Sequence, residues 1–164
     1  MPTLFEYQLD LLKIEIETIN ASIRQMDNMT EKVKNWAIVT WAAATGATIS
    51  QEKLQPFIAF TCFIPIVFWL TDTWYRRIQR KFIWRSRQIA QFLNDGRLER
   101  SFAQGSVVDF HLFDPSASRA RGPDYQQFVN WRKVMMFRSL SILYIGMSFM
   151  SLLAAALKYL LVRA

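Results

Sequence analysis

Apolar and polar positions divide this chain into three long apolar runs separated by charged stretches. The runs Asn35–Gln51, Leu54–Thr71 and Ser139–Leu157 contain no Asp, Glu, Lys or Arg and are 17, 18 and 19 residues long. As α-helices that rise about 1.5 Å per residue, they approach the thickness of a hydrocarbon core of about 30 Å. The pattern therefore predicts an all-α membrane protein with three transmembrane helices, and it disfavours a soluble protein with three buried core helices.

The first two runs are predicted to form a transmembrane hairpin over 35–71, with helices at 35–51 and 54–71 joined by a short turn. Pro65 lies inside the second of these helices, where a proline is expected to produce a kink. The third span is predicted at 139–162, because the ammonium group of Lys158 can reach the headgroups while its stem stays in the apolar layer.

Residues 1–34 carry a heptad pattern. Apolar side chains recur at intervals of four and three residues, at Phe5, Leu9, Leu12, Ile16, Ile19, Ile23 and Met26. This pattern predicts one long amphipathic helix that begins at a capping box formed by Thr3 and Glu6 and continues into the first span. Two uses of the apolar seam remain open. It can mediate oligomerisation as a coiled coil, or it can pack within the chain against a helix over 76–93.

The stretch 72–138 is predicted to contain a helix at 74–94, a loop at 96–123 and a second helix at 124–138. Gly96 suits the left-handed residue that ends a helix, and Asp124 suits the cap of the next one. Asp72 and Arg76 are one helical turn apart, so a local ion pair is expected between them.

Charge is distributed unevenly along the chain, and this predicts its topology. Residues 72–138 hold thirteen basic and six acidic side chains, whereas residues 1–34 hold four basic and six acidic ones. Lys and Arg accumulate on the cytoplasmic side of membrane proteins. We therefore expect a bacterial inner-membrane protein with a cytoplasmic N-terminal helix, a basic cytoplasmic segment between the second and third spans, and a periplasmic C-terminus.

Six basic residues follow the second span directly and are candidates for contact with a partner or with lipid. They are Arg76, Arg77, Arg80, Lys81, Arg85 and Arg87. Next to a membrane, each of them can attract anionic lipid by about 1 kcal/mol. The same side chains, interleaved with aromatic ones, could instead contact nucleic acid. Their position beside a span favours lipid, and direct contact with nucleic acid stays open.

No pattern in the sequence indicates an enzyme. His111 is the single histidine, and Asp109 and Asp114 near it do not complete the ligand set of a zinc site. Cys62 is the single cysteine and lies within an apolar run. We therefore assign no catalytic residue, no cofactor and no metal site.

A resemblance to a known class rests on four features in their order along the chain. A charged helix enters a membrane hairpin through Lys34-Asn-Trp36, and the run Phe68-Trp-Leu-Thr-Asp-Thr-Trp-Tyr75 precedes the basic helix. The segment Asp109-Phe-His-Leu-Phe-Asp-Pro115 and a last span follow. This arrangement resembles the small multi-pass membrane effectors of bacterial anti-phage defence loci, in particular the transmembrane effector of a retron system.

The resemblance implies an abortive-infection effector that compromises the inner membrane when phage infection triggers it. Its partners would then be a reverse transcriptase and the DNA–RNA product of that enzyme. The alternative is a non-lytic membrane anchor or scaffold that recruits a cytosolic complex through the heptad helix and the basic segment.

Overall fold

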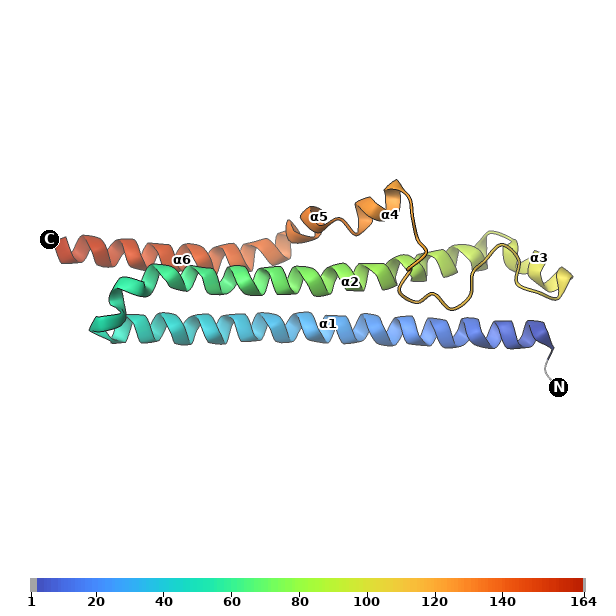
Figure 1. Cartoon of the computed structure of the whole chain (residues 1–164), viewed down its shortest axis with the longest axis horizontal. Coiled ribbons are helices and arrows are strands. Elements are labelled where there is room, and N and C mark those ends of the chain that lie inside the picture. The colour runs from blue at the N-terminus through green and yellow to red at the C-terminus, as the bar shows by residue number, and fades with distance from the viewer. Residues whose placement is uncertain (1–2, 164) are drawn as a thin grey trace. The chain divides into compact units, whose positions relative to one another are not determined.

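The computed structural model describes residues 3–163, and side chains as far as residue 160, so the first two residues of the predicted N-terminal helix lie outside it. All the regular structure in this part of the chain is helical (Figure 1). The elements are α1 (Leu4–Ser50), the 3₁₀ helix η1 (Glu52–Cys62), α2 (Phe63–Asn94), α3 (Arg97–Gln104), α4 (Pro123–Phe128), α5 (Trp131–Met135) and α6 (Arg138–Arg163). An all-helical protein is therefore confirmed.

The chain forms two compact units. The first unit combines the residues up to Asp27 with Arg77–Val129, and the second combines Asn28–Arg76 with the residues from Asn130 onward. Both units contain parts of α1 and α2, because the division falls within these two helices. Each unit has its own cluster of buried apolar side chains.

Helix α1 begins and continues as its sequence predicts. The Thr3 amide donates to Glu6 Oε2 at 2.6 Å, and the Glu6 amide donates to Thr3 Oγ1 at 3.2 Å. This is the reciprocal capping box, which satisfies backbone donors that have no partner within the helix. One uninterrupted helix then extends to Ser50, so the prediction that the heptad segment continues into the next apolar run is confirmed.

The predicted second span differs from expectation in its first half. Residues Glu52–Cys62 form a 3₁₀ helix, and the α-helix begins only at Phe63. Pro65 therefore lies in the first turn of α2, where the 3₁₀ geometry of η1 changes to α geometry, and not in the interior of an α-helix. The prediction that Pro65 lies inside an α-helical second span is wrong in this respect, and a kink at Pro65 stays a prediction. The end of α2 is as predicted, because Gly96 is left-handed with φ +77°.

The predicted loop 96–123 and helix 124–138 also need correction. The loop contains the short helix α3, and its remainder, residues 105–122, has no strand. The second predicted helix is divided into α4, α5 and the start of α6. Asp124 is not a cap, since Pro123 already begins α4, whereas the Asn130 side chain caps α5 by accepting from the Arg132 amide.

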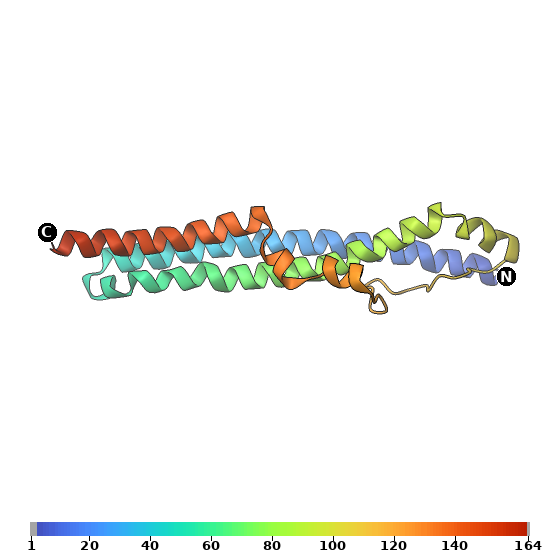
Figure 2. The same cartoon turned by 90° about the horizontal axis from the view of Figure 1, so that it is seen from above.

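The second unit is held together by an apolar cluster and a polar one. Ala37, Leu140, Tyr144 and Met147 are buried together, and Trp41 and Phe68 pack against them. In the polar cluster, Ser151 Oγ accepts from Trp41 Nε1 at 2.8 Å and from Thr61 Oγ1 at 3.0 Å. One serine of α6 thereby joins α1 and η1, and Figure 2 shows these three elements along the second unit.

Replacing Ser151 by alanine is expected to destabilise the second unit by about 1 kcal/mol, because the Trp41 N–H loses its acceptor in an apolar setting, whereas the Thr61 hydroxyl keeps the Ile58 carbonyl at 2.7 Å. Ser141→Ala is the matched control, since the Ser141 hydroxyl donates to the Phe137 carbonyl one turn earlier in the same helix region and joins no other element of the described chain. Unfolding of the purified protein in mixed detergent measures both variants. Equal stability of S151A and S141A would contradict the bridging role.

The surface of the second unit is strongly apolar. Phe60, Val67, Ile142 and Phe149 are each 60–64% exposed. Two helical segments of the described chain, Glu52–Asn94 and Pro123–Leu160, are long and apolar enough to cross a membrane, and only 17% and 22% of their most apolar stretches are buried. Core helices of soluble proteins are mostly buried, so this exposure favours a membrane location for the two segments. The Ala- and Thr-rich run at 35–51 is not among the two segments.

Candidate functional site

A buried ion pair joins α1 to α2 in the first unit. Arg85 Nε donates to Glu15 Oε1 at 2.7 Å, and Arg85 Nη2 donates to Glu15 Oε2 at 3.1 Å. The Glu15 side chain is 0% exposed, and the Arg85 side chain is 5% exposed. This is a bidentate pair, the geometry in which a guanidinium and a carboxylate bind most strongly.

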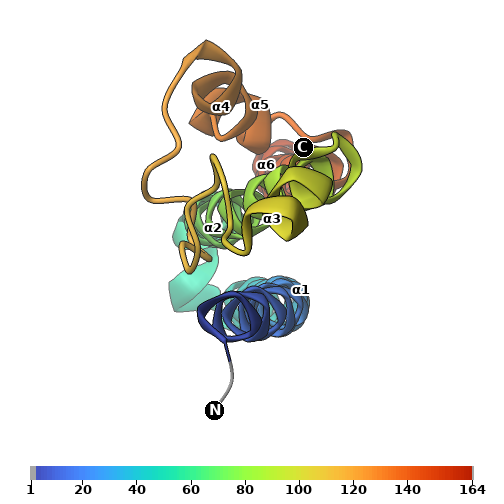
Figure 3. The same cartoon turned by 90° about the vertical axis from the view of Figure 1, so that its right-hand side faces the viewer.

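The same two side chains hold a segment that lacks regular structure. We call residues 105–122, between α3 and α4, the strap (Figure 3). Glu15 accepts from the amides of Phe113 at 2.8 Å and Asp114 at 2.9 Å. Arg85 donates to the His111 carbonyl, and its guanidinium carbon lies 4.5 Å from the centre of the Phe110 ring. The buried pair therefore serves as a clasp for the strap.

Apolar side chains of the strap complete the core of the first unit. Leu12 and Ile19 of α1 are buried with Ile89 and Phe92 of α2, and the strap packs Val107, Phe110 and Leu112 against them. The rings of Phe92 and Phe110 are stacked with their centres 4.5 Å apart. Gln8 and Ser101 add polar contacts, since their side-chain oxygens accept from the amides of Val107 and Val108 at 2.8 and 3.1 Å.

The strap backbone is strained at three residues. Asp109, Phe113 and Ala117 have φ of 52°, 58° and 50°. Non-glycine residues rarely adopt this left-handed conformation, and each such residue costs of order 1–3 kcal/mol. One of the three residues, Phe113, donates its own amide to Glu15. The clasp contacts thus hold the strap in a conformation that the free segment would disfavour.

Asp114 organises the turn that follows the clasp. Its carboxylate accepts from the Ser118 hydroxyl at 2.6 Å, from the Ser118 amide at 2.8 Å and from the Arg119 amide at 3.1 Å. Burial by itself raises the pKa of a carboxyl group, but these hydrogen bonds together outweigh it and hold the pKa of Asp114 below its ordinary value of 3.8.

The turn at 114–119 is therefore expected to loosen only in strong acid. A carboxyl group whose pKa is lower in the folded state contributes stability that is fully present above the unfolded value and is lost as pH falls through the folded value. The amide proton shifts of Ser118 and Arg119, followed by NMR, should titrate with a midpoint below 3.8. A midpoint at or above that value would contradict the assignment, and Asp114→Asn should abolish the titration.

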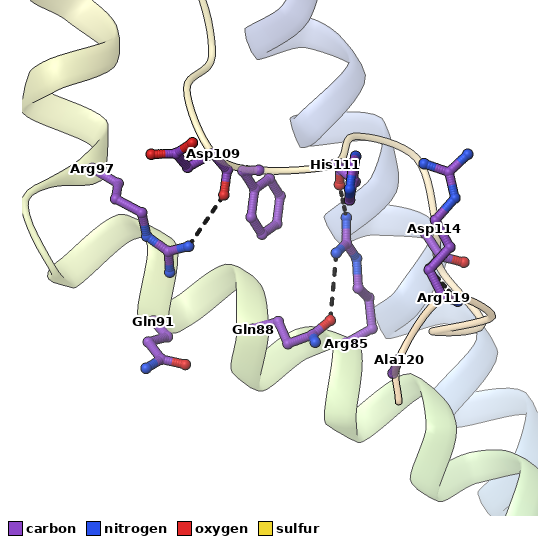
Figure 4. A pocket seen from close by; sticks show the side chains of 10 residues that line it. Arg85, Gln88, Gln91, Arg97, Asp109, His111, Asp114, Arg119 and Ala120 are labelled. Atoms are coloured by element: carbon purple, nitrogen blue, oxygen red, sulfur yellow. Dashed lines mark hydrogen bonds between the residues drawn. The ribbon is translucent and has the colours of Figure 1, made fainter. Parts of the chain in front are cut away.

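A pocket of about 240 Å³ lies between the strap and α2. Figure 4 shows Arg85, Gln88 and Gln91 of α2 facing Asp109, His111 and Asp114 of the strap, with the Arg97, Phe110, Arg119 and Ala120 side chains also lining it. Its charges are balanced within the first unit. Glu15 neutralises Arg85, and Asp95 pairs with Arg97 at 2.7 Å. The lining also holds Arg119, Asp109 and Asp114, so that with Glu15 and Asp95 there are four carboxylates for three arginines. The pocket therefore has no excess of positive charge with which to select an anion.

The single histidine, His111, contacts the first unit through its backbone carbonyl. The His111 side chain is exposed, and its carbonyl accepts from Arg85. Among the described residues, no group of three or more His, Cys, Asp or Glu side chains is arranged to hold a metal ion.

Most of the six basic candidates make ion pairs, hydrogen bonds or cation–π contacts within the chain. Arg76 lies 3.5 Å from Asp72, which confirms the predicted local ion pair. Arg77 Nε donates to the Val129 carbonyl at 3.0 Å, and Arg80 and Arg87 lie over the Phe128 ring at 4.7 and 4.6 Å. Arg80 also donates to the Phe128 carbonyl. These contacts hold α4 against α2.

The six candidates differ in the surface they leave for a partner. Arg85 is 4% exposed and is enclosed by its contacts in the clasp. Arg87 is exposed, and Arg76, Arg77, Arg80 and Lys81 are partly exposed. Contact of these five residues with lipid or a partner stays a prediction.

The seven seam residues lie along the interior side of α1 in the first unit. Leu12 and Ile19 are buried, and Ile16 and Ile23 pack against the same cluster. The Phe5 ring lies 5.0 Å from the ring of Phe102, and Leu9 and Met26 are partly buried. Intrachain packing on α2, one of the two uses left open by the sequence, is therefore present. Oligomerisation through the seam stays a prediction.

Sequence reasoning did not identify Glu15 or the strap contacts. One signal was available for Glu15, because it lies three residues after Leu12 and four before Ile19, on the apolar face of the helix. A carboxylate on such a face needs a buried partner.

Comparison of the chain with protein-family models, curated protein sequences and solved structures finds no match, and none of the three identifies a retron effector.

Proposed function

We propose that this protein is a membrane effector of a bacterial antiviral defence system that compromises the inner membrane when it is triggered. The observation that carries the proposal is the largely exposed apolar surface of the two membrane-length segments, in a chain that also forms a separately packed polar unit. Such a chain can combine a membrane-active part with a part that receives a signal. The order of motifs from Lys34 to Pro115 supports the defence role by resemblance. No catalytic step is assigned.

The proposed topology has three spans, at 35–51, 54–71 and 139–162. The first of these is the least apolar, but Ala37 and Trp41 within it pack against the cluster containing Leu140 and Tyr144 of α6. A weakly apolar helix inserts more readily when it packs against a neighbour. The excess of basic side chains in 72–138 supports a cytoplasmic location for this segment and the N-terminus and a periplasmic location for the C-terminus.

The active form is proposed to be a homo-oligomer embedded in membrane lipid. Three helices of one chain are too few to enclose an aqueous pore, since their side chains fill the space between them. Several copies are therefore needed to breach a bilayer. The partly exposed basic side chains, Arg76 and Lys81 among them, are placed beside the second span and are suited to anionic lipid.

A reverse transcriptase with its DNA–RNA product is the proposed regulatory partner, on the basis of the resemblance alone. Co-purification of the tagged membrane protein with the products of its neighbouring genes tests this part. Failure to recover a reverse transcriptase would remove the retron assignment and leave the membrane activity to be tested separately.

A non-lytic scaffold is the second candidate, and one observation favours it. The first unit has its own apolar core, formed by Leu12, Ile19, Ile89 and Phe92, and could present a folded surface to a cytosolic complex. In that case the membrane part would serve only as an anchor.

Uptake of a membrane-impermeant dye distinguishes the two candidates. Cells that carry the gene with its neighbours are challenged with phage, and dye entry is followed together with phage yield. The effector proposal predicts dye entry before phage release and lower phage yield. Protection from phage in cells that exclude the dye would overturn the effector proposal and favour the scaffold.

A further inference from the structure

A pocket of about 370 Å³ lies between η1 and α6 in the second unit. The two helices lie side by side (Figure 1), and two hydrogen bonds join them. The Thr61 hydroxyl donates to Ser151 Oγ at 3.0 Å, and the Ser148 hydroxyl donates to the Cys62 carbonyl at 3.1 Å. Ala155, which lines the pocket, is one helical turn beyond Ser151. The hydrogen bonds therefore fix the spacing of the two walls close to the pocket.

The pocket lining combines charged and apolar side chains. Glu52 and Gln55 contribute from η1, and Lys158 and Tyr159 contribute from α6. Glu52 is exposed and Lys158 is partly buried. The apolar part of the lining comes from the same two helices and consists of Pro56, Ile58, Ala59 and Ala155. A ligand in this pocket therefore meets a carboxylate and an ammonium group beside apolar surface.

Glu52 and Lys158 take no part in the ion pairs of the described chain. In the pocket beside the strap, by contrast, two arginines form ion pairs within the first unit. Opposite charges from two helices complement a ligand that carries both signs of charge, because each charge of the ligand then meets an opposite one. A purely anionic ligand would place its charge near Glu52, and a purely cationic one would place its charge near Lys158.

The surroundings of the pocket favour a lipid as the ligand. Large apolar side chains of the same two helices, Phe57, Phe60 and Leu160, are 53–63% exposed. Acyl chains can cover such a surface, whereas water cannot do so without cost. In the proposed topology, the turn before η1 and Lys158 both lie at the periplasmic boundary of the spans. A phospholipid can therefore place its headgroup in the pocket and its acyl chains against the exposed apolar side chains.

We propose that this pocket binds the headgroup of a phospholipid that carries both a phosphate and a primary ammonium group, as phosphatidylethanolamine does. Lys158 donates to the phosphate, and Glu52 accepts from the ammonium group, so both contacts are charge-assisted hydrogen bonds. Phosphatidylglycerol has no ammonium group, and the methylated ammonium group of phosphatidylcholine has no N–H to donate. The inference rests on the membrane location in the proposed function, but it requires no leakage through the bilayer.

The test uses the full chain, purified in detergent and freed of lipid, with native mass spectrometry to count bound phospholipid. Phosphatidylethanolamine, phosphatidylglycerol and phosphatidylcholine with identical acyl chains are added in equal amounts. We expect phosphatidylethanolamine to bind about tenfold more tightly than either of the others, because each of them lacks the hydrogen bond to Glu52. Equal binding of the three lipids would overturn the inference. So would displacement of the lipid by an equal concentration of glycerophosphoethanolamine, which has the same headgroup without acyl chains.

Lys158→Gln is the first variant, and Lys53→Gln is its matched control. Lys53 is exposed, has the same charge and does not line the pocket. We expect K158Q to bind phosphatidylethanolamine about tenfold more weakly and K53Q to bind it as the unmodified chain does. Glu52→Gln should remove the preference for phosphatidylethanolamine over phosphatidylglycerol. Equal affinities of K158Q and K53Q would overturn the inference, because the effect would then be one of general charge.

Ala155→Leu is a second variant that keeps both charges. Its larger side chain fills part of the pocket, so phosphatidylethanolamine should bind more weakly. If K158Q loses its helical circular dichroism, A155L takes its place, and unchanged affinity in A155L would overturn the inference. Selective binding to a chain that leaves vesicles sealed would support this inference while contradicting the proposed function. Vesicle leakage by a chain without headgroup selectivity would contradict this inference alone.

Discussion

Replacing Arg85 by alanine is expected to lower the free energy of unfolding by about 3–5 kcal/mol, one of the largest effects expected of a single side chain in the first unit. The reason is the position of Glu15, whose carboxylate is 0% exposed and bonded to Arg85 through both oxygens. Without the guanidinium, a buried negative charge remains with only the two strap amides as partners. Chemical unfolding of the purified chain, followed by helical circular dichroism, gives the value.

Arg87→Ala is the matched control for this prediction. Arg87 lies on the same helix but is exposed, and its guanidinium group contacts the face of the Phe128 ring. Loss of an exposed cation–π contact costs about 0.5–1 kcal/mol. Equal destabilisation by R85A and R87A would show that the Glu15–Arg85 pair does not hold the first unit together.

The second large effect concerns Phe149, near the middle of the last apolar run. Phe149→Lys is expected to oppose insertion of α6 by about 3 kcal/mol, which is about 100-fold in an equilibrium, because a charge at the centre of a spanning helix loses its hydration. A C-terminal alkaline phosphatase fusion measures the effect, since the enzyme is active only in the periplasm. We expect high activity for the unmodified sequence and a large loss in F149K.

Phe102→Lys provides the comparison, because Phe102 is 61% exposed and Phe149 is 60% exposed. The two phenylalanines differ in their unit, since Phe102 lies on α3 in the first unit. If both substitutions leave the fusion equally active, α6 is not a membrane span. Because the two phenylalanines are equally exposed, a difference between the two variants reports the lipid environment of α6 and not the addition of a surface charge.

What could be predicted from the sequence was governed by short-range contacts. The capping box of Thr3 and Glu6, the left-handed Gly96 and the Asp72–Arg76 pair each involve residues at most four positions apart, and all three are present. The physical rules for such contacts refer only to neighbouring residues on one helix.

Contacts between distant residues could not be predicted in the same way. Glu15 and Arg85 are 70 residues apart, and no local rule selects Arg85 among the six basic residues that follow the second run. The strap contains three left-handed residues that are not glycine, so the glycines that usually mark left-handed positions in a sequence do not indicate its path. Pro65 illustrates a further limit, because a proline fits both a helix interior and a first turn, and only the true start of the helix decides between them.

The proposed membrane activity can be measured with nothing present except the chain and lipid. The purified protein is incorporated into vesicles of bacterial phospholipid that contain a self-quenched dye, at several ratios of protein to lipid. The account predicts dye release that rises more steeply than in proportion to protein density, because several copies must associate. Vesicles that remain sealed, while flotation shows that the protein is inserted, would contradict it.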